Sequence, residues 1–362
     1  MPFVDAAQVL TPSGVVGPAR VQWEAGVITA VEPIAAAPAR ILAPGFIDLQ
    51  VNGIDDVDVA TADGDDWGRL DSLLLQQGVT TWCPTLITMP LPRFERPLER
   101  IGAAMQRPTD HHPRPFIAGA HLEGPFLGGA PGAHPPDLIT DIDRSWLAAL
   151  PEHVRLVTLG AEQPEAADAT RLLTSHGRLV SIGHSRANEA QFDSVVAAGA
   201  RLTTHLFNGM SGVHHRDPGV ATWALTNPQV CASLIADGVH VHPRVLRLAF
   251  QTLGPDRTVL VTDAVAWRAG HAGSVLLEVR DGAPRLPDGT LAGSTLTMDR
   301  ALRVCVDAGI PLERAVRAAS TVPARLLGLH DRGRIEVGAR ADLVALTADL
   351  AVEQVWVGGD AV

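Results

Sequence analysis

Between residues 45 and 264, short apolar runs rich in β-branched residues alternate with helix-like segments, and this alternation restricts the fold more than any other feature. The expected strands are Gly45–Val51, Val79–Leu86, Pro115–Leu122, Val154–Gly160, Arg178–Gly183, Arg201–His205, Val230–Ala236 and Thr258–Thr262. The expected helices between them include Trp67–Gln77, Pro164–His176, Asn188–Ala198 and Pro243–Leu253. Eight strand–helix units predict the α/β class and a closed (β/α)₈ TIM-type barrel, with its active site at the carboxyl ends of the strands.

The two ends of the chain follow a different pattern. Both residues 1–44 and residues 335–362 alternate short apolar pieces with turn residues, as in Val15-Val16-Gly17-Pro18 and Ala341–Leu346. This predicts one small β-sandwich domain built from both termini, with residues 45–334 forming the barrel. A Pro/Gly-rich stretch, Gly124–Pro136, follows the third strand and is a candidate lid.

Composition excludes several classes of protein. The formal charge of −11 argues against a nucleic-acid binder, which usually carries a basic face. The cysteines Cys83, Cys231 and Cys305 are far apart, as expected of buried thiols in a reducing compartment. We find neither a secretory signal nor a run of about 18 apolar residues, so we expect a cytoplasmic protein without membrane contact.

Four expected strands end at, or directly before, a side chain suited to metal chemistry: Glu123, His184, His205 and Asp263. One carboxylate and two imidazoles suffice for a catalytic divalent-cation site with one position open. Such a cation lowers the pKa of its bound water to roughly 7 and polarises a carbonyl group. Asp263 could then take the proton of the water and return it to a departing amine.

Each of these residues has a commoner role when taken alone. A single histidine after a strand is usually structural, Glu123 could cap the following segment, and Asp263 could be a helix N-cap. Their coincidence at four strand ends of one barrel favours the metal site.

The segment after the sixth strand is ambiguous. Arg216 offers a planar fork suited to phosphate, but the sequence alone favours a surface ion pair with Asp217. His214 and His215 do not follow a strand directly, so we expect them to be loop residues rather than metal ligands.

Several motifs occur together and in a fixed order. They are Pro44–Gly53 (PGFIDLQVNG), His121–Phe126 (HLEGPF), Gly132–His134, Gly183–Ser185, Thr204–Met210 (THLFNGM), Ala236–His240, Val261–Ala264 and Leu291–Met298 (LAGSTLTM). With these motifs the chain resembles the N-acetylglucosamine-6-phosphate deacetylases of the amidohydrolase superfamily along nearly its whole length. Gly338–Val344 resembles the C-terminal β segment of that superfamily.

The resemblance implies a metal-dependent hydrolase that converts N-acetylglucosamine 6-phosphate to glucosamine 6-phosphate and acetate. Glu123, His184 and His205 would hold the metal, and Asp263 would act as general base and then as acid. Metal-bound hydroxide would attack the acetyl carbonyl, which His134 would help to polarise.

The resemblance also implies the residues that bind the substrate. Ala133 and His134 would contact the acetamido group, and Leu291, Ala292 and Gly293 would lie near the acetyl group or sugar. Asn208 and Gly209 would bind the phosphate. Arg216 and His240 would bind the phosphate and sugar, and Asp237, Gly238 and Val239 would shape the wall of the pocket around them. The family commonly forms homodimers, in which the partner subunit could complete the phosphate site.

Two places bear on the metal count and on specificity. Many amidohydrolases carry a His-x-His pair where this chain has Gln50-Val51-Asn52, and amides bind cations weakly. We therefore expect one divalent cation per subunit, with Gln50 as a weak or water-mediated partner. Zn²⁺ is the expected metal, although Fe²⁺, Mn²⁺ and Co²⁺ accept the same ligands. Val265–Arg268 is bulkier than expected, which leaves the sugar specificity open.

Two alternatives remain open from the sequence. The substrate could be the galactosamine epimer or another N-acyl amine, because motifs do not reveal the orientation of one hydroxyl group. The chain could also be a non-catalytic barrel that binds sugar phosphates, and would then carry no metal and release no acetate.

Overall fold

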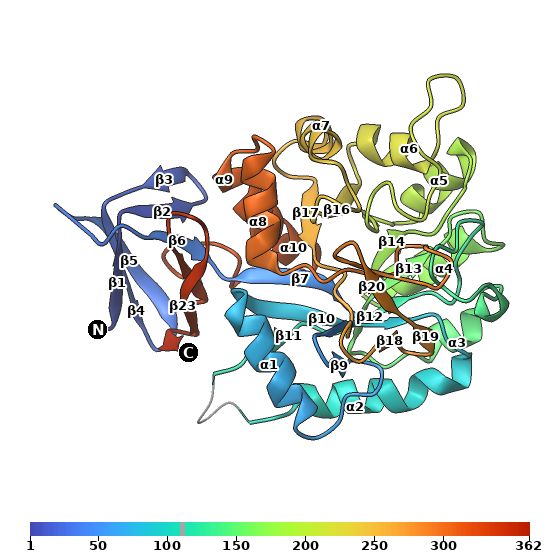
Figure 1. The fold of residues 1–362 in the computed structure, drawn as a ribbon, viewed down its shortest axis with the longest axis horizontal. Coiled ribbons are helices and arrows are strands. Elements are labelled where there is room, and N and C mark those ends of the chain that lie inside the picture. The colour runs from blue at the N-terminus through green and yellow to red at the C-terminus, as the bar shows by residue number, and fades with distance from the viewer. Residues whose placement is uncertain (109–112) are drawn as a thin grey trace.

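The centre of the structure is a barrel of parallel strands (Figure 1). A computed structural model describes residues 1–108 and 113–362 of the chain. The barrel strands are β7 (Phe46–Val51), β10 (Val79–Ile87), β12 (Ala120–Glu123), β13 (Val154–Leu159), β14 (Leu179–Ile182), β15 (Leu202–Thr203), β16 (Cys231–Ile235) and β17 (Thr258–Val261), each paired in parallel with the next. The predicted (β/α)₈ fold class is confirmed.

The first and last barrel strands meet just beyond the end of β17. There the N–H of Asp263 donates to the carbonyl oxygen of Gln50 at 3.0 Å, and Val51 forms a parallel bridge with Ala264. The joint that completes the barrel therefore brings the predicted base, Asp263, against the predicted metal neighbour, Gln50.

The third predicted strand, Pro115–Leu122, is two pieces in the structure. A short strand, β11 (Phe116–Ile117), and β12 both pair with β10, and Gly119 lies between them. Gly119 has a φ of +141°, and a Cβ there would lie 2.6 Å from the carbonyl oxygen of His153, so only glycine fits. After this kink β12 continues one residue further than predicted and ends on Glu123.

Helices surround the barrel. They are α1 (Asp66–Gln76), α2 (Glu95–Met105, after the 3₁₀ turn Leu91–Phe94), α3 (Arg144–Ala148), α4 (Ala166–Ser175), α5 (Glu189–Ala197), α6 (Val220–Thr226), α7 (Pro243–Leu253), α8 (Met298–Asp307), α9 (Leu312–Ala319) and α10 (Thr321–Leu326). The four predicted helices correspond to α1, α4, α5 and α7. In α7 the buried residues Leu246, Ala249, Phe250 and Leu253 follow helical spacing, so one apolar side packs against the barrel.

The two termini form a small β domain beside the barrel (Figure 1). One sheet is β1 (Phe3–Ala6), β4 (Ala19–Glu24) and β5 (Val27–Pro33), and the other runs β24 (Asp360–Ala361), β23 (Val352–Val357), β22 (Leu343–Leu346), β6 (Ile41–Pro44), β2 (Gln8–Thr11) and β3 (Gly14–Val16). They share a core that includes Trp23, Leu42 and Trp356. This confirms the predicted β domain, while the boundaries at 44/45 and 334/335 stay a prediction.

Short hairpins at the mouth of the barrel were not predicted. One pairs β8 (Gly53–Ile54) with β9 (Val57–Asp58), and others between β17 and α8 pair β18 (His271–Ala272) with β19 (Val275–Leu276) and β20 (Glu278–Arg280) with β21 (Ala283–Arg285). The segment after β17 carries an apolar cluster of its own, formed by Val265, Ala272, Val275, Leu277 and Ala292. In the two described ranges, no helix has the length and apolar character needed to cross a membrane.

Candidate active site

A cavity of about 220 Å³ lies at the carboxyl ends of the barrel strands and brings the predicted chemical groups together. Its wall includes Glu123, His134, His184, His205 and Asp263, all of them buried. Most of the predicted substrate-binding residues also line it, namely Ala133, His134, Asn208, Gly209, His240, Leu291, Ala292 and Gly293.

The three predicted metal ligands converge closely. Glu123 Oε1 lies 2.9 Å from His205 Nε2 and 3.2 Å from His184 Nε2, and the two Nε2 atoms are 3.1 Å apart. Ligand distances of about 2.0–2.1 Å at tetrahedral angles correspond to donor separations of about 3.4 Å. The trio is therefore compact enough to hold a single divalent cation.

Hydrogen bonds set the tautomer of both histidines. His184 Nδ1 lies 3.1 Å from the carbonyl oxygen of Ala130, and His205 Nδ1 lies 3.2 Å from that of Asn208. Because a carbonyl oxygen only accepts, each Nδ1 carries a proton, and each Nε2 is the nitrogen that would offer its lone pair to a cation. Histidines that bind metals in proteins usually have this second partner.

Three of the site residues have left-handed backbone conformations. The φ angles are +49° at His184, +30° at His205 and +50° at Asp263. Non-glycine residues adopt this region at a steric cost, and such strain concentrates at functional sites. At each of these residues the chain turns away from its strand, and each side chain lines the cavity.

Glycines allow the chain to approach the His184 ring. A Cβ on Gly209, where φ is +56°, would lie 2.7 Å from Nδ1 of His184. A Cβ on Gly132 would lie 3.3 Å from Cε1 of the same ring. Gly209 is therefore required by both backbone conformation and space.

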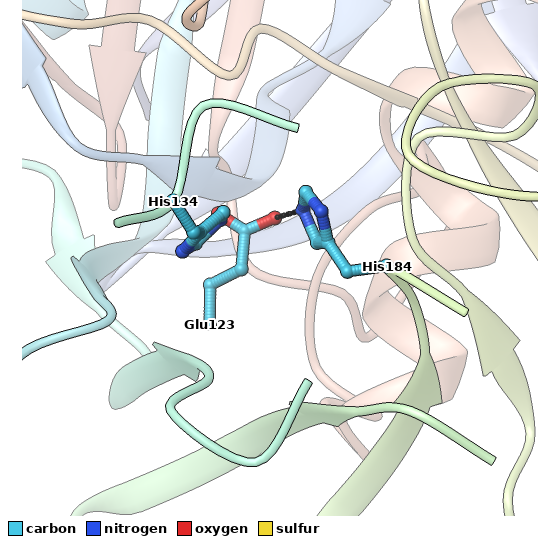
Figure 2. A group of neighbouring side chains, drawn as sticks. All are labelled: Glu123, His134 and His184. Atoms are coloured by element: carbon cyan, nitrogen blue, oxygen red, sulfur yellow. Dashed lines mark hydrogen bonds and ion pairs between the residues drawn. The ribbon is translucent and has the colours of Figure 1, made fainter. Parts of the chain in front are cut away.

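His134 lies beside the carboxylate of Glu123, and its ring packs edge-on against that of His184 (Figure 2). Its Nδ1 is 2.8 Å from Thr88 Oγ1 and accepts the N–H of Thr88 at 3.4 Å, which leaves the proton on Nε2. Nε2 lies 3.7 Å from Glu123 Oε2. Burial, together with the nearby imidazole of His184, lowers the pKa of His134 to about 3, so the ring is neutral.

His134 is close enough to be considered as a ligand itself. Donor atoms of Glu123, His134 and His184 all lie within 4.8 Å of one another. His205 Nε2 lies 2.9 Å from Glu123 Oε1, whereas His134 Nε2 lies 3.7 Å from Glu123 Oε2, so His205 stays the predicted third ligand. His134, in contrast, presents an N–H that can donate to a substrate oxygen.

Asp263 is held by two amide side chains. Its Oδ1 accepts from Gln50 Nε2 at 3.0 Å and from Asn52 Nδ2 at 2.7 Å. Burial, and then the charge of Glu123, raises the pKa of Asp263 to about 7. The alternative role as a helix N-cap is wrong, because the next helix, α8, begins only at Met298.

Gln50 lies between the predicted metal ligand and the predicted base. Its Nε2 also donates to Glu123 Oε1 at 3.0 Å. Burial raises the pKa of Glu123, but hydrogen bonds with His184 and His205 outweigh this, and the pKa falls well below its usual value. Asn52 was not predicted to be a site residue. The signal was present, since Gln50 and Asn52 are two residues apart and so share one face of an extended chain.

His240 lines the cavity, and the carboxylate of Asp237 contacts the His240 ring through Nδ1. Asp237 Oδ2 lies 2.7 Å from His240 Nδ1, and Oδ1 accepts the N–H groups of Val239 and His240. Burial raises the pKa of Asp237, but the hydrogen bonds from His240 outweigh it, so the pKa is lowered. Asp237, Gly238 and Val239 are not part of the described cavity wall.

Arg216 is also outside that wall. It lies on an exposed loop between β15 and α6, with Nη1 2.9 Å from His215 Nε2. The described cavity wall contains no arginine, and the sequence contains no lysine. Arg216 as a phosphate ligand stays a prediction.

One side of the cavity is apolar and was largely missed from the sequence. Ile87, Ala272, Val275 and Leu277 line it, and the bulky segment Val265–Arg268 contributes Val265. Trp267 packs against the apolar cluster, and Arg268 Nε pairs with Asp55 Oδ1 at 2.8 Å.

The chain is similar to known proteins over nearly its full length. The amidohydrolase family model matches residues 41–362. An N-acetylgalactosamine-6-phosphate deacetylase of Escherichia coli O157:H7 is 36% identical over 98% of this chain and 97% of its own length. An N-acetylglucosamine-6-phosphate deacetylase of Homo sapiens is 38% identical over 89% of this chain and 83% of its own length.

Solved structures are similar as well. The N-acetyl-D-glucosamine-6-phosphate deacetylase of Mycobacterium smegmatis aligns with a TM-score of 0.92 and 33% identity, covering 100% of both chains. The corresponding enzyme of Thermotoga maritima aligns with a TM-score of 0.91 and 30% identity, covering 99% of both.

Proposed function

The chain belongs to the amidohydrolase family, and on this basis we propose that it hydrolyses the acetamide of N-acetylglucosamine 6-phosphate to glucosamine 6-phosphate and acetate. One observation carries the proposal. Oε1 of Glu123 and the Nε2 atoms of His184 and His205 lie within 3.2 Å of one another. The side-chain amide of Gln50 donates both to Glu123 and to Asp263, and these two carboxylates line the same cavity.

The donor set fits one divalent cation, for which we propose Zn²⁺ with Fe²⁺, Mn²⁺ and Co²⁺ as alternatives. The Nε2 atoms of His184 and His205 converge with one carboxylate oxygen of Glu123. The Nδ1–H groups of both imidazoles point away from this centre, toward backbone carbonyl oxygens. A cation there would polarise the acetyl carbonyl and make water acidic enough to ionise near neutral pH.

The surrounding side chains move and stabilise the charges. Asp263, held through Oδ1 by Gln50 and Asn52, takes the proton of the attacking water and later gives it to the departing amine. His134 donates from Nε2 to the carbonyl oxygen as negative charge develops on it. The neutral state of His134 and its contact with Thr88 support this role.

We propose that Asn208, Gly209 and His240 bind the sugar phosphate and that Arg216 supplies the positive charge. Because Arg216 lies outside the cavity wall, the proposal includes a homodimer in which the phosphate site is completed across the interface. Free, buried cysteines at 83, 231 and 305 support a reducing compartment, and we propose the cytoplasm.

The epimer N-acetylgalactosamine 6-phosphate is a second candidate substrate. It is favoured by the E. coli relative, which aligns with 98% of this chain and is named for that epimer. Acetate release from both epimers, compared by kcat/KM, separates the two candidates.

Metal content and acetate release test the proposal together. We expect about one divalent cation per chain, acetate release from N-acetylglucosamine 6-phosphate, and loss of activity with a chelator that is restored by the metal. A protein that binds no metal and releases no acetate from either epimer is instead the non-catalytic barrel.

A further inference from the structure

Loop 124–136 follows β12 and places His134 in the cavity wall, so the position of this loop determines the position of His134. The Gly132 side of the loop approaches the His184 ring, and the rings of His134 and His184 lie 4.3 Å apart, inclined at 70°. A small shift of the loop would therefore change the position of the His134 Nε2–H relative to the metal ligands.

The carboxylate of Glu162 joins this loop to the residues that follow His184. Its Oε1 accepts the N–H of Gly129 at 2.7 Å and the N–H of Arg186 at 2.6 Å. Its Oε2 accepts the hydroxyl of Ser185 at 2.5 Å. Glu162 is half-buried, lies three residues beyond β13, and is not part of the described cavity wall.

The direction of the Ser185 hydrogen bond is fixed by its other partners. Ser185 Oγ accepts the N–H of Ala161 at 3.3 Å and the N–H of Ala187 at 3.2 Å. Its one proton is therefore donated to Glu162, which receives three donors in all. A carboxylate, which only accepts, suits this place, whereas an amide would turn its own N–H groups toward at least one donor.

The loop is also held from its other side. Arg186 Nε donates to the carbonyl oxygen of Gly129 at 2.9 Å, so both backbone groups of Gly129 are bound. The N–H of Gly128 donates to the carbonyl oxygen of His184 at 2.8 Å. A Cβ on Gly128 would lie 2.1 Å from Glu162 Oε1, which shows how closely the carboxylate packs against the loop.

We propose that Glu162 is a positioning residue: its carboxylate clamps loop 124–136 onto Ser185 and thereby sets His134 opposite His184. Glu162 touches neither the metal ligands nor the cavity. It acts through His134, which under the proposed function donates to the substrate carbonyl. Only the kinetic part of the test rests on that function.

The first test is Glu162→Gln, which keeps the size of the side chain and removes one acceptor oxygen. Misplacing a catalytic group by about 1 Å can cost about 100-fold, so we expect kcat per bound metal to fall about 10-fold to 100-fold with KM changed less than about 2-fold. Metal content should not change.

Glu165→Gln is the matched control and should behave as wild type. Glu165 is exposed on the same segment, pairs with Arg144 and does not cap α4 through its side chain. Wild-type kinetics or loss of the metal in Glu162→Gln would overturn the proposal.

A double variant tests the route through His134. If Glu162 acts by placing His134, then Glu162→Gln should lower kcat less than about 2-fold further in a His134→Asn background. A full multiplicative loss in the double variant would show that Glu162 acts by another route, and the proposal would be wrong.

Amide hydrogen exchange provides a readout that needs no substrate. In Glu162→Gln, exchange should become faster in residues 127–134 and stay unchanged in β13 and β14. Unchanged exchange in residues 127–134 would refute the clamp. If the wild-type protein released no acetate from either epimer, the proposed function would fail, and hydrogen exchange would still decide whether the clamp exists.

Discussion

Nε2 of His205 lies 2.9 Å from Oε1 of Glu123, although 82 residues separate them in the sequence. They meet because β12 and β15 are parallel strands of one barrel and both end at the same mouth. The same geometry adds His184 from the end of β14, so the three donors come from three different strand ends.

His205→Ala should remove one of the three ligands and leave the fold intact. We expect metal affinity to fall by at least about 100-fold and acetate release to fall in parallel. Metal analysis after dialysis, together with circular dichroism, measures the two effects. His330→Ala is the control, because His330 is exposed and is not part of the described cavity wall. Full metal occupancy in His205→Ala would remove His205 from the ligand set.

Asp263→Asn should keep the metal and lose turnover. Asn cannot accept the proton of water, and general acid–base groups contribute about 10²- to 10⁴-fold, so kcat should fall within that range. Metal content and kcat are measured on the same sample. Near-normal acetate release by Asp263→Asn would exclude Asp263 as the base.

The acid side of the pH profile should report on Asp263. The base must be ionised, so kcat/KM is expected to fall as the pH drops below the pKa of Asp263, which burial and Glu123 raise to about 7 in the protein alone. A bound cation lowers that pKa. The hydrogen bond from Asn52 also lowers it, so Asn52→Leu should move the acid limb to higher pH. A limb that stays in place or moves to lower pH contradicts this assignment.

Gly209→Ala should disturb the site through the His184 ring. The new Cβ would lie 2.7 Å from Nδ1 of His184 at a φ of +56°, so we expect a loss of about 1–3 kcal/mol in the free energy of unfolding and reduced metal affinity. Gly212→Ala on the same loop is the matched control, because a Cβ there meets no atom within 4 Å. Denaturant unfolding and metal titration compare the two variants.

Arg216→Ala should raise KM for the phosphorylated substrate. Loss of a charge-assisted phosphate contact costs about 1.5–3 kcal/mol, which corresponds to about 10-fold or more in KM. N-acetylglucosamine without the phosphate should show no such difference. Arg244→Ala, which removes another exposed arginine, is the control. Equal effects on both substrates would exclude Arg216 as a phosphate ligand.

The polar residues at the strand ends could be predicted from the sequence, whereas the hydrogen bonds that hold these and the loop residues in place could not. The positions of Glu123, His184, His205 and Asp263 follow from strand periodicity and from the rule that parallel strands end at one mouth. The hydrogen bonds that the N–H of Thr88 donates to His134 and the N–H of Gly129 donates to Glu162 depend on how loops fold back, and local sequence does not encode that geometry.

The apolar wall of the cavity escaped prediction for a related reason. Ala272, Val275 and Leu277 lie on or beside two-residue strands, which are too short to show a period of two. Asn52 was different. It lies two residues after Gln50 and directly after the end of β7, and both amides donate to Asp263.

The sheet of the small domain has a consequence for synthesis of the protein on the ribosome. β22, which follows the barrel in the sequence, lies between β23 and β6, which precedes the barrel. One edge of β6 therefore stays unpaired during synthesis until residues 343–346 have emerged from the ribosome. A ribosome that stalls before Leu343 would leave that edge open to pairing with another nascent chain.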